Sequence, residues 1–283
     1  MEQGKLYLCA TPIGNLEDIT YRVVRILGEV DLIAAEDTRH SIKLLNHFNI
    51  KTPMTSYHEF NKIEKAKVLV DKMLNGVNIA LVTDAGTPGI SDPGEELVRQ
   101  AAAAGIEVTS LPGAVACVTA LTISGLSTRR FAFEAFLPTD KKDRVRILES
   151  LVDETRTIVM YEAPHRLKKT LTLLEEYLGD RNIAICKELT KLHENAFRTT
   201  ISKAIAHYDK NEPKGEFVLV IEGKSFSEIE SENKAKLEEI SIYEHYQQYI
   251  AKGLDSKEAM KVVAKERGIS KRDVYAEVLE NKE

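Results

Sequence analysis

The sequence has few cysteines and no long apolar run, and each shortage excludes a class of protein. Its three cysteines, Cys9, Cys117 and Cys186, lie far apart and form no C-x-x-C pair, so neither a disulfide framework nor a zinc site is expected. Residues 1–15 hold one lysine and an apolar stretch too short for a secretory signal. No run approaches the length of a membrane span. We therefore expect a cytoplasmic protein that is neither secreted nor embedded in a membrane.

A large excess of either charge is also missing. The chain has 39 Lys and Arg against 44 Asp and Glu, which gives a formal net charge of −5 over 283 residues. A nucleic-acid partner would therefore have to be met by local basic patches. With 43% hydrophobic residues, the chain is long enough for two domains that each bury a core.

The common signatures of hydrolytic and metal sites are absent as well. There is no G-x-S-x-G, and no cysteine has a histidine beside it in the sequence, so nucleophilic catalysis has no support. The pair His193-Glu194 is followed by Phe197 at the position where a metalloprotease helix has its second histidine. No metal site is predicted.

The most informative stretch that is present runs from Ala80 to Glu95 and is rich in glycine and proline. The apolar run Ile79–Val82 at its start is typical of a buried parallel strand, and its end can open a helix. Asp92 can cap that helix, and Glu95 stands three residues later, as in a capping box. The pattern predicts a rigid loop at the carboxyl end of a strand, where open α/β sheets bind small molecules.

The composition of this loop limits its ligand. Gly86, Gly89 and Gly94 allow positive φ or a close approach of the ligand to the backbone. The loop matches neither the dinucleotide nor the P-loop motif and has no lysine for a phosphate, whereas the carboxylate of Asp84 stands at its mouth. A cationic or hydroxyl-rich ligand would suit it. The alternative is an ordinary strand-to-helix turn, for which glycine and proline are also typical.

Short apolar runs alternate with amphipathic stretches up to Pro112, which predicts an N-terminal parallel α/β domain over residues 1–112. The expected strands are Leu6–Ala10, Leu32–Ala35, Met54–Tyr57, Ile79–Val82 and Val108–Leu111. Pro112-Gly113 ends this unit, and a second α/β domain is expected over 113–224. Its strands are expected near 132–136, 158–161, 183–187 and 217–221.

The C-terminal part is predicted to be helical and separate. Residues 225–240 are polar and charged with little to bury, which favours a linker. Residues 241–283 predict three helices, in which Ser256 caps the second, Gly268 ends it, and Ser270 with Asp273 caps the third. This is the outline of a helix-turn-helix. Its many lysines and arginines could contact RNA, or they could be the solvated face of a packing or dimerisation hairpin.

Two further stretches follow predicted strands and mix both charges with a histidine. They are residues 161–166 (Tyr-Glu-Ala-Pro-His-Arg) and 187–194 (Lys-Glu-Leu-Thr-Lys-Leu-His-Glu). Strand ends are a common place for ligand contacts, but also for surface ion pairs.

Taken together, these motifs resemble the ribosomal RNA small subunit methyltransferase I family, within the tetrapyrrole-methylase superfamily. The resemblance covers roughly residues 5–223 and passes through residues 11–20, 35–39, 84–94, 111–113, 136–138, 161–166, 187–194 and 214–216. The sequence departs from the family at Ala135, where a glycine usually precedes Phe-Leu-Pro, and at Asn195, where an acidic residue is usual. Neither position touches the loop of Asp84.

The resemblance implies two α/β domains with a cofactor cleft between them, a helical extension, and a homodimer. It also implies methylation of a cytidine ribose 2′-hydroxyl in 16S rRNA near the decoding centre, on naked rRNA or on the small ribosomal subunit, with S-adenosylmethionine as donor. By carry-over, the cofactor-binding residues are Pro12, Asp84, Gly86, Thr87, Val115, Ala116, Tyr161 and Glu162.

A ribose hydroxyl is a poor nucleophile until it loses its proton, so a base within hydrogen-bond reach would help. Candidates are Glu36, Asp37, His58, Glu188 and His193. We take Asp37, Glu188 and His193 as the catalytic set and hypothesise that Asp37 and Glu188 face the acceptor, because each ends a strand beside the cleft. The expected substrate-binding residues are Arg39, His58 and Arg166, the two arginines for phosphate.

Two other functions remain open at this point. A methylase of a small tetrapyrrole or corrin precursor would use the same fold and the same loop. A catalytically silent nucleotide- or RNA-binding module is the second alternative, and it would show no binding of S-adenosylmethionine.

Overall fold

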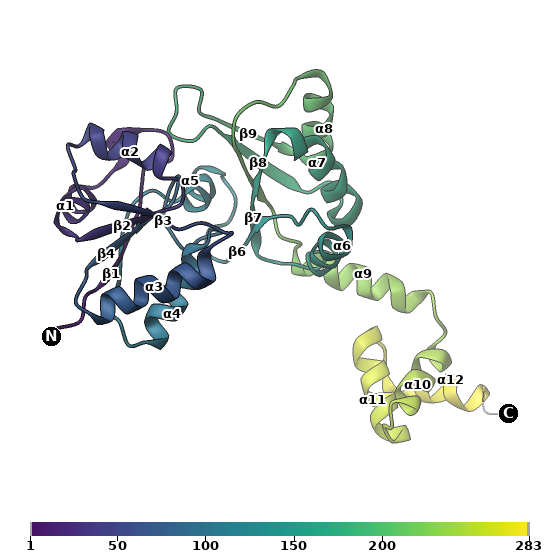
Figure 1. Cartoon of the computed structure of the whole chain (residues 1–283). Helices are drawn as coiled ribbons and strands as arrows, with labels where there is room; N and C mark the ends of the chain where they lie inside the picture. Colours follow the sequence, from purple (N-terminus) through teal and green to yellow (C-terminus); the bar gives the residue numbers. More distant parts are fainter. Residues whose placement is uncertain (1, 282–283) are drawn as a thin grey trace. The chain divides into compact units, whose positions relative to one another are not determined.

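The computed structural model describes residues 2–281, which form two compact units that divide between Glu222 and Gly223. The first unit contains two five-stranded sheets with helices on both faces, and the second is entirely helical (Figure 1). Within the described residues, no helix is both long and apolar enough to cross a membrane. The predicted α/β fold with a helical extension is confirmed.

The first sheet is parallel throughout, as predicted, and its strands lie in the order β3-β2-β4-β1-β5. They are β1 (Leu6–Cys9), β2 (Leu32–Ala35), β3 (Met54–Ser56), β4 (Ile79–Val82) and β5 (Val108–Leu111). After β1 the chain adds β2 and then β3, which forms one edge of the sheet. After β4 it adds β5, which forms the opposite edge. The direction of winding therefore reverses between β1 and β4, where doubly wound sheets bind their ligands.

Helices cover both faces of this sheet. On one face lie α1 (Tyr21–Glu29) and α2 (Thr38–His47), which share a buried cluster with the strands. On the other lie α3 (Lys62–Leu74) and α4 (Gly94–Ala103), with a second cluster. The short 3-10 helix η1 (Leu16–Asp18) precedes α1. Because both faces are covered, the strands can be apolar along their whole length, and all four residues of β4 are buried.

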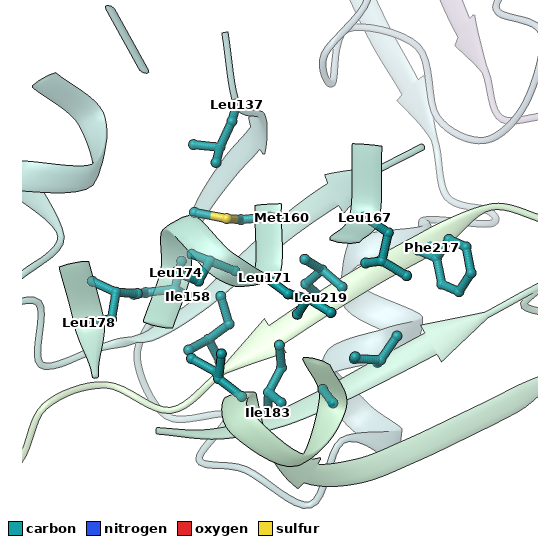
Figure 2. Packing of buried hydrophobic residues seen from close by; sticks show 14 of the residues in the cluster. Leu137, Ile158, Met160, Leu167, Leu171, Leu174, Leu178, Ile183, Phe217 and Leu219 are labelled. Atoms are coloured by element: carbon teal, nitrogen blue, oxygen red, sulfur yellow. The ribbon is translucent and has the colours of Figure 1, made fainter. Parts of the chain in front are cut away.

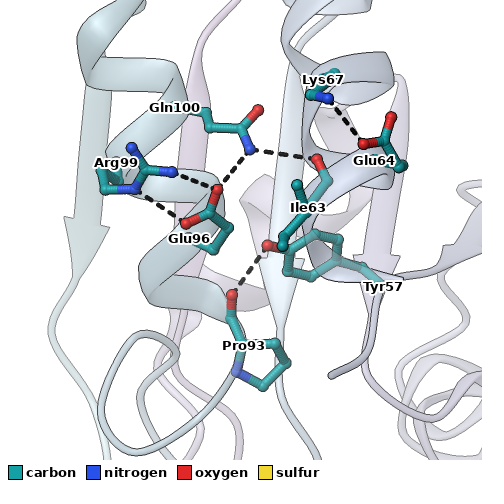
Figure 3. A network of polar contacts seen from close by, with 8 residues as sticks. All are labelled: Tyr57, Ile63, Glu64, Lys67, Pro93, Glu96, Arg99 and Gln100. Atoms are coloured by element: carbon teal, nitrogen blue, oxygen red, sulfur yellow. Dashed lines mark hydrogen bonds and ion pairs between the residues drawn. The ribbon is translucent and has the colours of Figure 1, made fainter. Parts of the chain in front are cut away.

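A polar network ties α4 and the residue before it to neighbouring segments of the first sheet's layer (Figure 3). The hydroxyl of Tyr57, a residue only 1% exposed, donates to the carbonyl of Pro93 at 2.9 Å. Gln100 on α4 donates to the carbonyl of Ile63 on α3 at 3.2 Å. The first bond fixes the point where the loop enters α4, and the second joins α4 to α3.

The second sheet is mixed rather than wound like the first, with the strand order β6-β7-β10-β8-β9. Its strands are β6 (Phe131–Phe136), β7 (Thr157–Glu162), β8 (Asn182–Lys187), β9 (Asn195–Thr200) and β10 (Phe217–Ile221). Only β6 and β7 pair in parallel, and the other three pairs are antiparallel. β9 was not predicted, whereas the other four strands lie where they were expected.

The core of this second sheet lies on the side of α6 (Lys141–Ser150), α7 (Pro164–Leu178) and α8 (Ile201–Lys210). Figure 2 shows its leucines, isoleucines and Met160 packed between strands and helices. The opposite face is covered by α5 (Ala116–Ile123), which follows β5 in the chain but packs against β7 and β10. The chain therefore crosses from the first sheet to the second immediately after Pro112-Gly113.

The helical unit starts with α9 (Phe226–Glu238), so the predicted linker forms a helix. Ser225 and Glu228 make a capping box at its start, and none of its residues is buried. The next helices are α10 (Ile242–Ala251), α11 (Ser256–Arg267) and α12 (Lys271–Glu280), which share a small core. The stop at Gly268 and the Ser270–Asp273 capping box are confirmed, but the cap of α11 is Asp255 rather than Ser256.

Ala135 has a positive φ of 49°, at a bulge where the pairing of β6 with β7 shifts register. A side chain in this region costs about 1–2 kcal/mol, which explains why a glycine is usual here. We expect Ala135→Gly to raise the free energy of unfolding by about 0.5–1 kcal/mol, because the relief of strain exceeds the added freedom of the unfolded chain. Urea unfolding measures this change. Ala132→Gly on the same strand is the control and should destabilise; loss of stability in both variants would contradict the prediction.

The three cysteines are free and buried. Burial raises the pKa of the Cys9 thiol from 9.0 to about 12 and that of Cys186 to about 11. Above pH 9 these thiols ionise in the unfolded chain but not in the folded one, so the free energy of unfolding should fall as the pH rises from 9 towards 11. A Cys9→Ala/Cys186→Ala variant should lose part of this pH dependence in urea titrations. Rapid alkylation of the native protein at pH 8 would show that the thiols are not protected.

Candidate functional site

The loops after β1 and β4 are joined directly at the point where the winding reverses. The backbone N–H of Thr11 donates to the carbonyl of Gly86 at 2.9 Å, and the N–H of Gly86 donates to the carbonyl of Thr11 at 3.0 Å. Gly86 has φ +84°, and a Cβ there would lie 3.3 Å from Cγ2 of Ile13. The predicted need for glycine therefore holds here, and the two loops form one rigid rim.

Asp92 holds the glycine-rich loop and also accepts from the first backbone N–H of α4. Its carboxylate accepts from the backbone N–H of Gly89 at 2.9 Å and from that of Gly94 at 2.7 Å. Helix α4 begins at Gly94 with Pro93 as its N-cap residue and no side-chain cap. The predicted capping box of Asp92 and Glu95 is therefore wrong, although the rigidity that it was expected to give is provided by Asp92 itself.

A cavity of about 710 Å³ lies beside this rim, with walls from both sheets. The first sheet contributes its glycine-rich loop, and the second contributes the end of β7 and the start of β10, which pair at Phe217 and Glu162. Five carboxylates are among the lining residues: Glu36, Asp84, Asp92, Glu162 and Glu216. None of the described residues in the lining is a lysine or an arginine. This first cavity therefore suits a cationic ligand and disfavours a polyphosphate.

Most of the predicted cofactor residues line this first cavity. They are Asp84, Gly86, Thr87, Val115, Ala116, Tyr161 and Glu162. Thr87 also donates to the carbonyl of Ala114 at 3.0 Å, which ties the loop to the start of α5. Burial raises the pKa of Tyr161, whose ring packs edge-on against Phe133. The structure thus brings together residues that are as far apart in the sequence as Asp84 and Glu162.

A second cavity, of about 590 Å³, adjoins the first. The two share Ile13, Thr83, Asp84, Ala85 and Glu216 in their walls. Pro12, the remaining predicted cofactor residue, lines the second cavity. Its wall also carries four basic side chains, those of His40, Lys43, His47 and Lys191. The two cavities therefore differ in charge and meet at Asp84.

Asp84 and Glu162 line the same cavity but differ in their surroundings. Asp84 is exposed, and among the described residues its side chain has no hydrogen-bond partner. Glu162 is 2% exposed and accepts from Thr170 at 2.5 Å and from the backbone N–H of Ala163 at 2.8 Å. Arg166 lies 3.4 Å from it and donates to the carbonyl of Leu137. Glu162 therefore supports the wall, and Arg166, predicted for phosphate, is engaged in that support.

Asp37 is paired with Arg39, which was also predicted for phosphate. Its carboxylate accepts from the Arg39 guanidinium at 2.7 Å and from the Arg39 backbone N–H at 2.8 Å. Hydrogen bonding to Arg39 holds the pKa of Asp37 well below its usual range, which weakens it as a base. Neither residue is among the described residues that line the two cavities. The catalytic role of Asp37 and the substrate role of Arg39 stay predictions.

Glu188 follows β8 directly and contacts Glu216, a residue that lines both cavities. It accepts from the backbone N–H of Glu216 at 2.9 Å and from Lys191 at 3.1 Å, and the N–H bond is the main cause of its lowered pKa. A Cβ on Gly215 would lie 2.5 Å from Oε1 of Glu188, so glycine is needed for this contact. His193 is exposed in the same loop. Glu188 and His193 line neither cavity among the described residues, and their catalytic roles stay predictions.

His58, the remaining predicted substrate residue, lies in the loop after β3. Its Nε2 is 3.3 Å from the side-chain amide of Asn61, and its backbone N–H donates to the same side chain at 2.9 Å. It is not among the described residues that line the two cavities. Its substrate role likewise stays a prediction.

Some residues that line the cavities were not singled out from the sequence, and one, Glu36, was named only as one of several candidate bases. Glu36 lines the first cavity and accepts from the hydroxyl of Thr83 at 2.6 Å. His40, Lys43 and His47 line the second, although no sequence motif had marked Lys43 or His47. Their spacing places them on one face of α2, and this periodicity after a strand end was the signal that could have found them.

Comparison with known proteins places this fold in a family. Residues 5–205 match the family model of the tetrapyrrole (corrin/porphyrin) methylases. The chain is 50% identical over 278 residues to ribosomal RNA small subunit methyltransferase I of Synechocystis sp., covering 98% of each chain. It is also 50% identical to the protein of that name from Halalkalibacterium halodurans, covering 97% of this chain and 94% of the relative.

A solved structure with a similar fold is that of uroporphyrin-III-C-methyltransferase from Thermus thermophilus. It superposes with a TM-score of 0.55 and 19% identity, over 77% of this chain and 94% of that one. At this identity the likeness concerns the fold alone. The unit that holds the two sheets is long enough to account for the 77% of this chain that superposes.

Proposed function

This chain belongs to the ribosomal RNA small subunit methyltransferase I family of the tetrapyrrole (corrin/porphyrin) methylases, and we propose that it methylates a cytidine ribose 2′-hydroxyl in 16S rRNA with S-adenosylmethionine as donor. The observation that carries the proposal is the pair of adjoining cavities, one lined by five carboxylates and the other by two lysines and two histidines, which meet at Asp84. A cationic donor and an anionic nucleic acid need such a pair.

The residues of the first cavity fit the proposed donor. S-adenosylmethionine supplies a methyl group already activated on a positively charged sulfur. The carboxylate-rich wall without lysine or arginine among its described residues favours that charge. Backbone groups of the loop around Gly86 and Thr87, with Val115 and Ala116, would hold the nucleoside part, and Asp84 would bind its hydroxyls or its amino group.

The chain's own contribution is then to position the acceptor and to receive its proton. Positioning alone can supply a large share of a rate enhancement when the reacting atoms are aligned. Glu36 lines the first cavity and is oriented by the hydroxyl of Thr83. It is therefore the candidate base that the geometry favours among those named from the sequence. Methyl transfer by Glu36→Gln, measured against pH, tests this role.

The proposed function is tested by offering the labelled donor to two acceptors, small ribosomal subunits and a precorrin. We expect label in the RNA, at one cytidine that primer-extension mapping of 16S rRNA identifies. Label in the small molecule alone would favour a tetrapyrrole methylase instead. Absence of heat on titration with S-adenosylmethionine would favour the silent binding module.

The resemblance to the family also leads us to propose a cytoplasmic homodimer. Light scattering on the purified chain tests the oligomeric state, and a monomer at micromolar concentration would contradict it.

A further inference from the structure

We propose that the second cavity binds the phosphodiester backbone of the RNA beside the target nucleotide, through the edge of α2 formed by His40, Lys43 and His47. The proposal rests on the proposed function and deepens it, because it assigns the part of the substrate that the second cavity holds. We call these three residues the basic edge of α2.

The basic edge lies where a strand bound at the reaction site would have to pass. Helix α2 starts directly after β2, so its first turn lies at the same end of the sheet as the glycine-rich loop. All three side chains are exposed and line the second cavity, whose wall is continuous with the first at Asp84. A chain of nucleotides can therefore leave the reaction site along α2.

The basic side chains of the second cavity that are free to meet a ligand lie mainly at this edge. Lys191, the fourth basic residue of the wall, is bound to Glu216 at 2.8 Å and to Glu188 at 3.1 Å. Lys43 has no ion-pair partner among the described residues, and it projects from α2 one turn beyond His40. From His40 to His47 the helix rises by about 10 Å, which is long enough for more than one phosphate.

Apolar side chains also line the second cavity, which suits the remaining parts of a nucleotide. Leu16 is 44% exposed there, and Leu44 is half-buried beside the basic edge. Apolar side chains and imidazole rings can pack against bases or sugars, while cations meet the phosphates. This combination favours a single-stranded RNA segment over a free phosphate ion, which would not use the leucines.

The experiment compares wild type with His40→Ala/Lys43→Ala/His47→Ala in binding to small ribosomal subunits over a range of salt. These side chains are exposed, whereas the residues with which α2 packs, Ser41 and Leu45, are unchanged. We expect roughly tenfold weaker binding at low salt, and a slope of log affinity against log salt that is smaller by about 0.7 for each phosphate that the variant no longer neutralises. The KM for subunits should rise more than kcat falls.

Two controls separate the possible outcomes. Lys72→Ala removes an exposed cation from α3, on the opposite face of the same sheet, and should leave both the affinity and the slope unchanged. Calorimetry with S-adenosylmethionine should give the wild-type affinity for the triple variant, which shows that it is folded.

Equal slopes for wild type and the triple variant would overturn the inference, even if wild type methylates RNA. If wild type binds RNA with the expected slope but transfers no methyl group, the proposed function fails and the basic edge stands.

Discussion

Glu162→Ala is expected to lower the free energy of unfolding by about 3 kcal/mol. Its buried carboxylate accepts hydrogen bonds from Thr170 and from the backbone of Ala163, and it lies beside the half-buried Arg166. Removing the carboxylate would leave these donors without an acceptor and the guanidinium without its counter-charge, and such losses cost about 3–5 kcal/mol for a fully buried pair. The expected loss lies at the lower limit because Arg166 keeps some contact with water.

Urea unfolding of the full chain measures this effect. Glu176→Ala is a matched control, because Glu176 is an exposed carboxylate on α7, the same helix that carries Thr170 and Arg166. It should change the free energy by less than about 0.5 kcal/mol. A loss of under about 1 kcal/mol in Glu162→Ala, well below the cost of breaking a buried pair, would mean that the carboxylate is free for a ligand, as the sequence had suggested.

Asp84→Ala is expected to have the opposite signature, with little change in stability and roughly 100-fold slower methyl transfer. Asp84 is exposed at the junction of the two cavities, and no hydrogen bond found among the described residues depends on its side chain. A charge-assisted hydrogen bond to a ligand contributes about 1.5–3 kcal/mol, which corresponds to about 10- to 100-fold in affinity or rate. The upper value is expected because the carboxylate lines both cavities.

Three measurements decide this prediction: the affinity for S-adenosylmethionine by calorimetry, kcat/KM for small subunits, and the urea midpoint. Asp84→Asn should be intermediate, since the amide keeps one acceptor but loses the charge. Glu95→Ala removes an exposed carboxylate at the start of α4, outside both cavities, and should behave as wild type. Normal turnover of Asp84→Ala would exclude the junction as the reaction site.

The first sheet was predictable because its strands are short apolar runs buried on both faces, as in β4. The edge strand β9 was missed for the converse reason. Its residues, Asn195–Thr200, are largely polar and none is fully buried, so the sequence has no apolar run to mark it. The antiparallel pairing of β10 depends on partners remote in the chain, which periodicity within a segment does not encode.

The lining of the first cavity was largely predictable because its residues lie in conspicuous motifs, whereas the surroundings of each carboxylate were not. Asp37 and Asp84 both follow apolar strands, yet Asp37 forms an ion pair with Arg39, two residues away, and Asp84 is exposed. Burial and hydrogen bonding decide this difference, and both depend on tertiary contacts. The same holds for Glu162, which the family resemblance assigned to the cofactor and whose carboxylate is buried and hydrogen-bonded in the fold.

The position of β10 has a consequence for biosynthesis. β10 is the middle strand of its sheet and is buried along its whole length, but it is the last strand to be synthesised, at residues 217–221. The first sheet, in contrast, has all of its strands once residue 111 has been made. A nascent chain should therefore acquire a protease-resistant N-terminal half early, while its second half stays open until translation has passed β10.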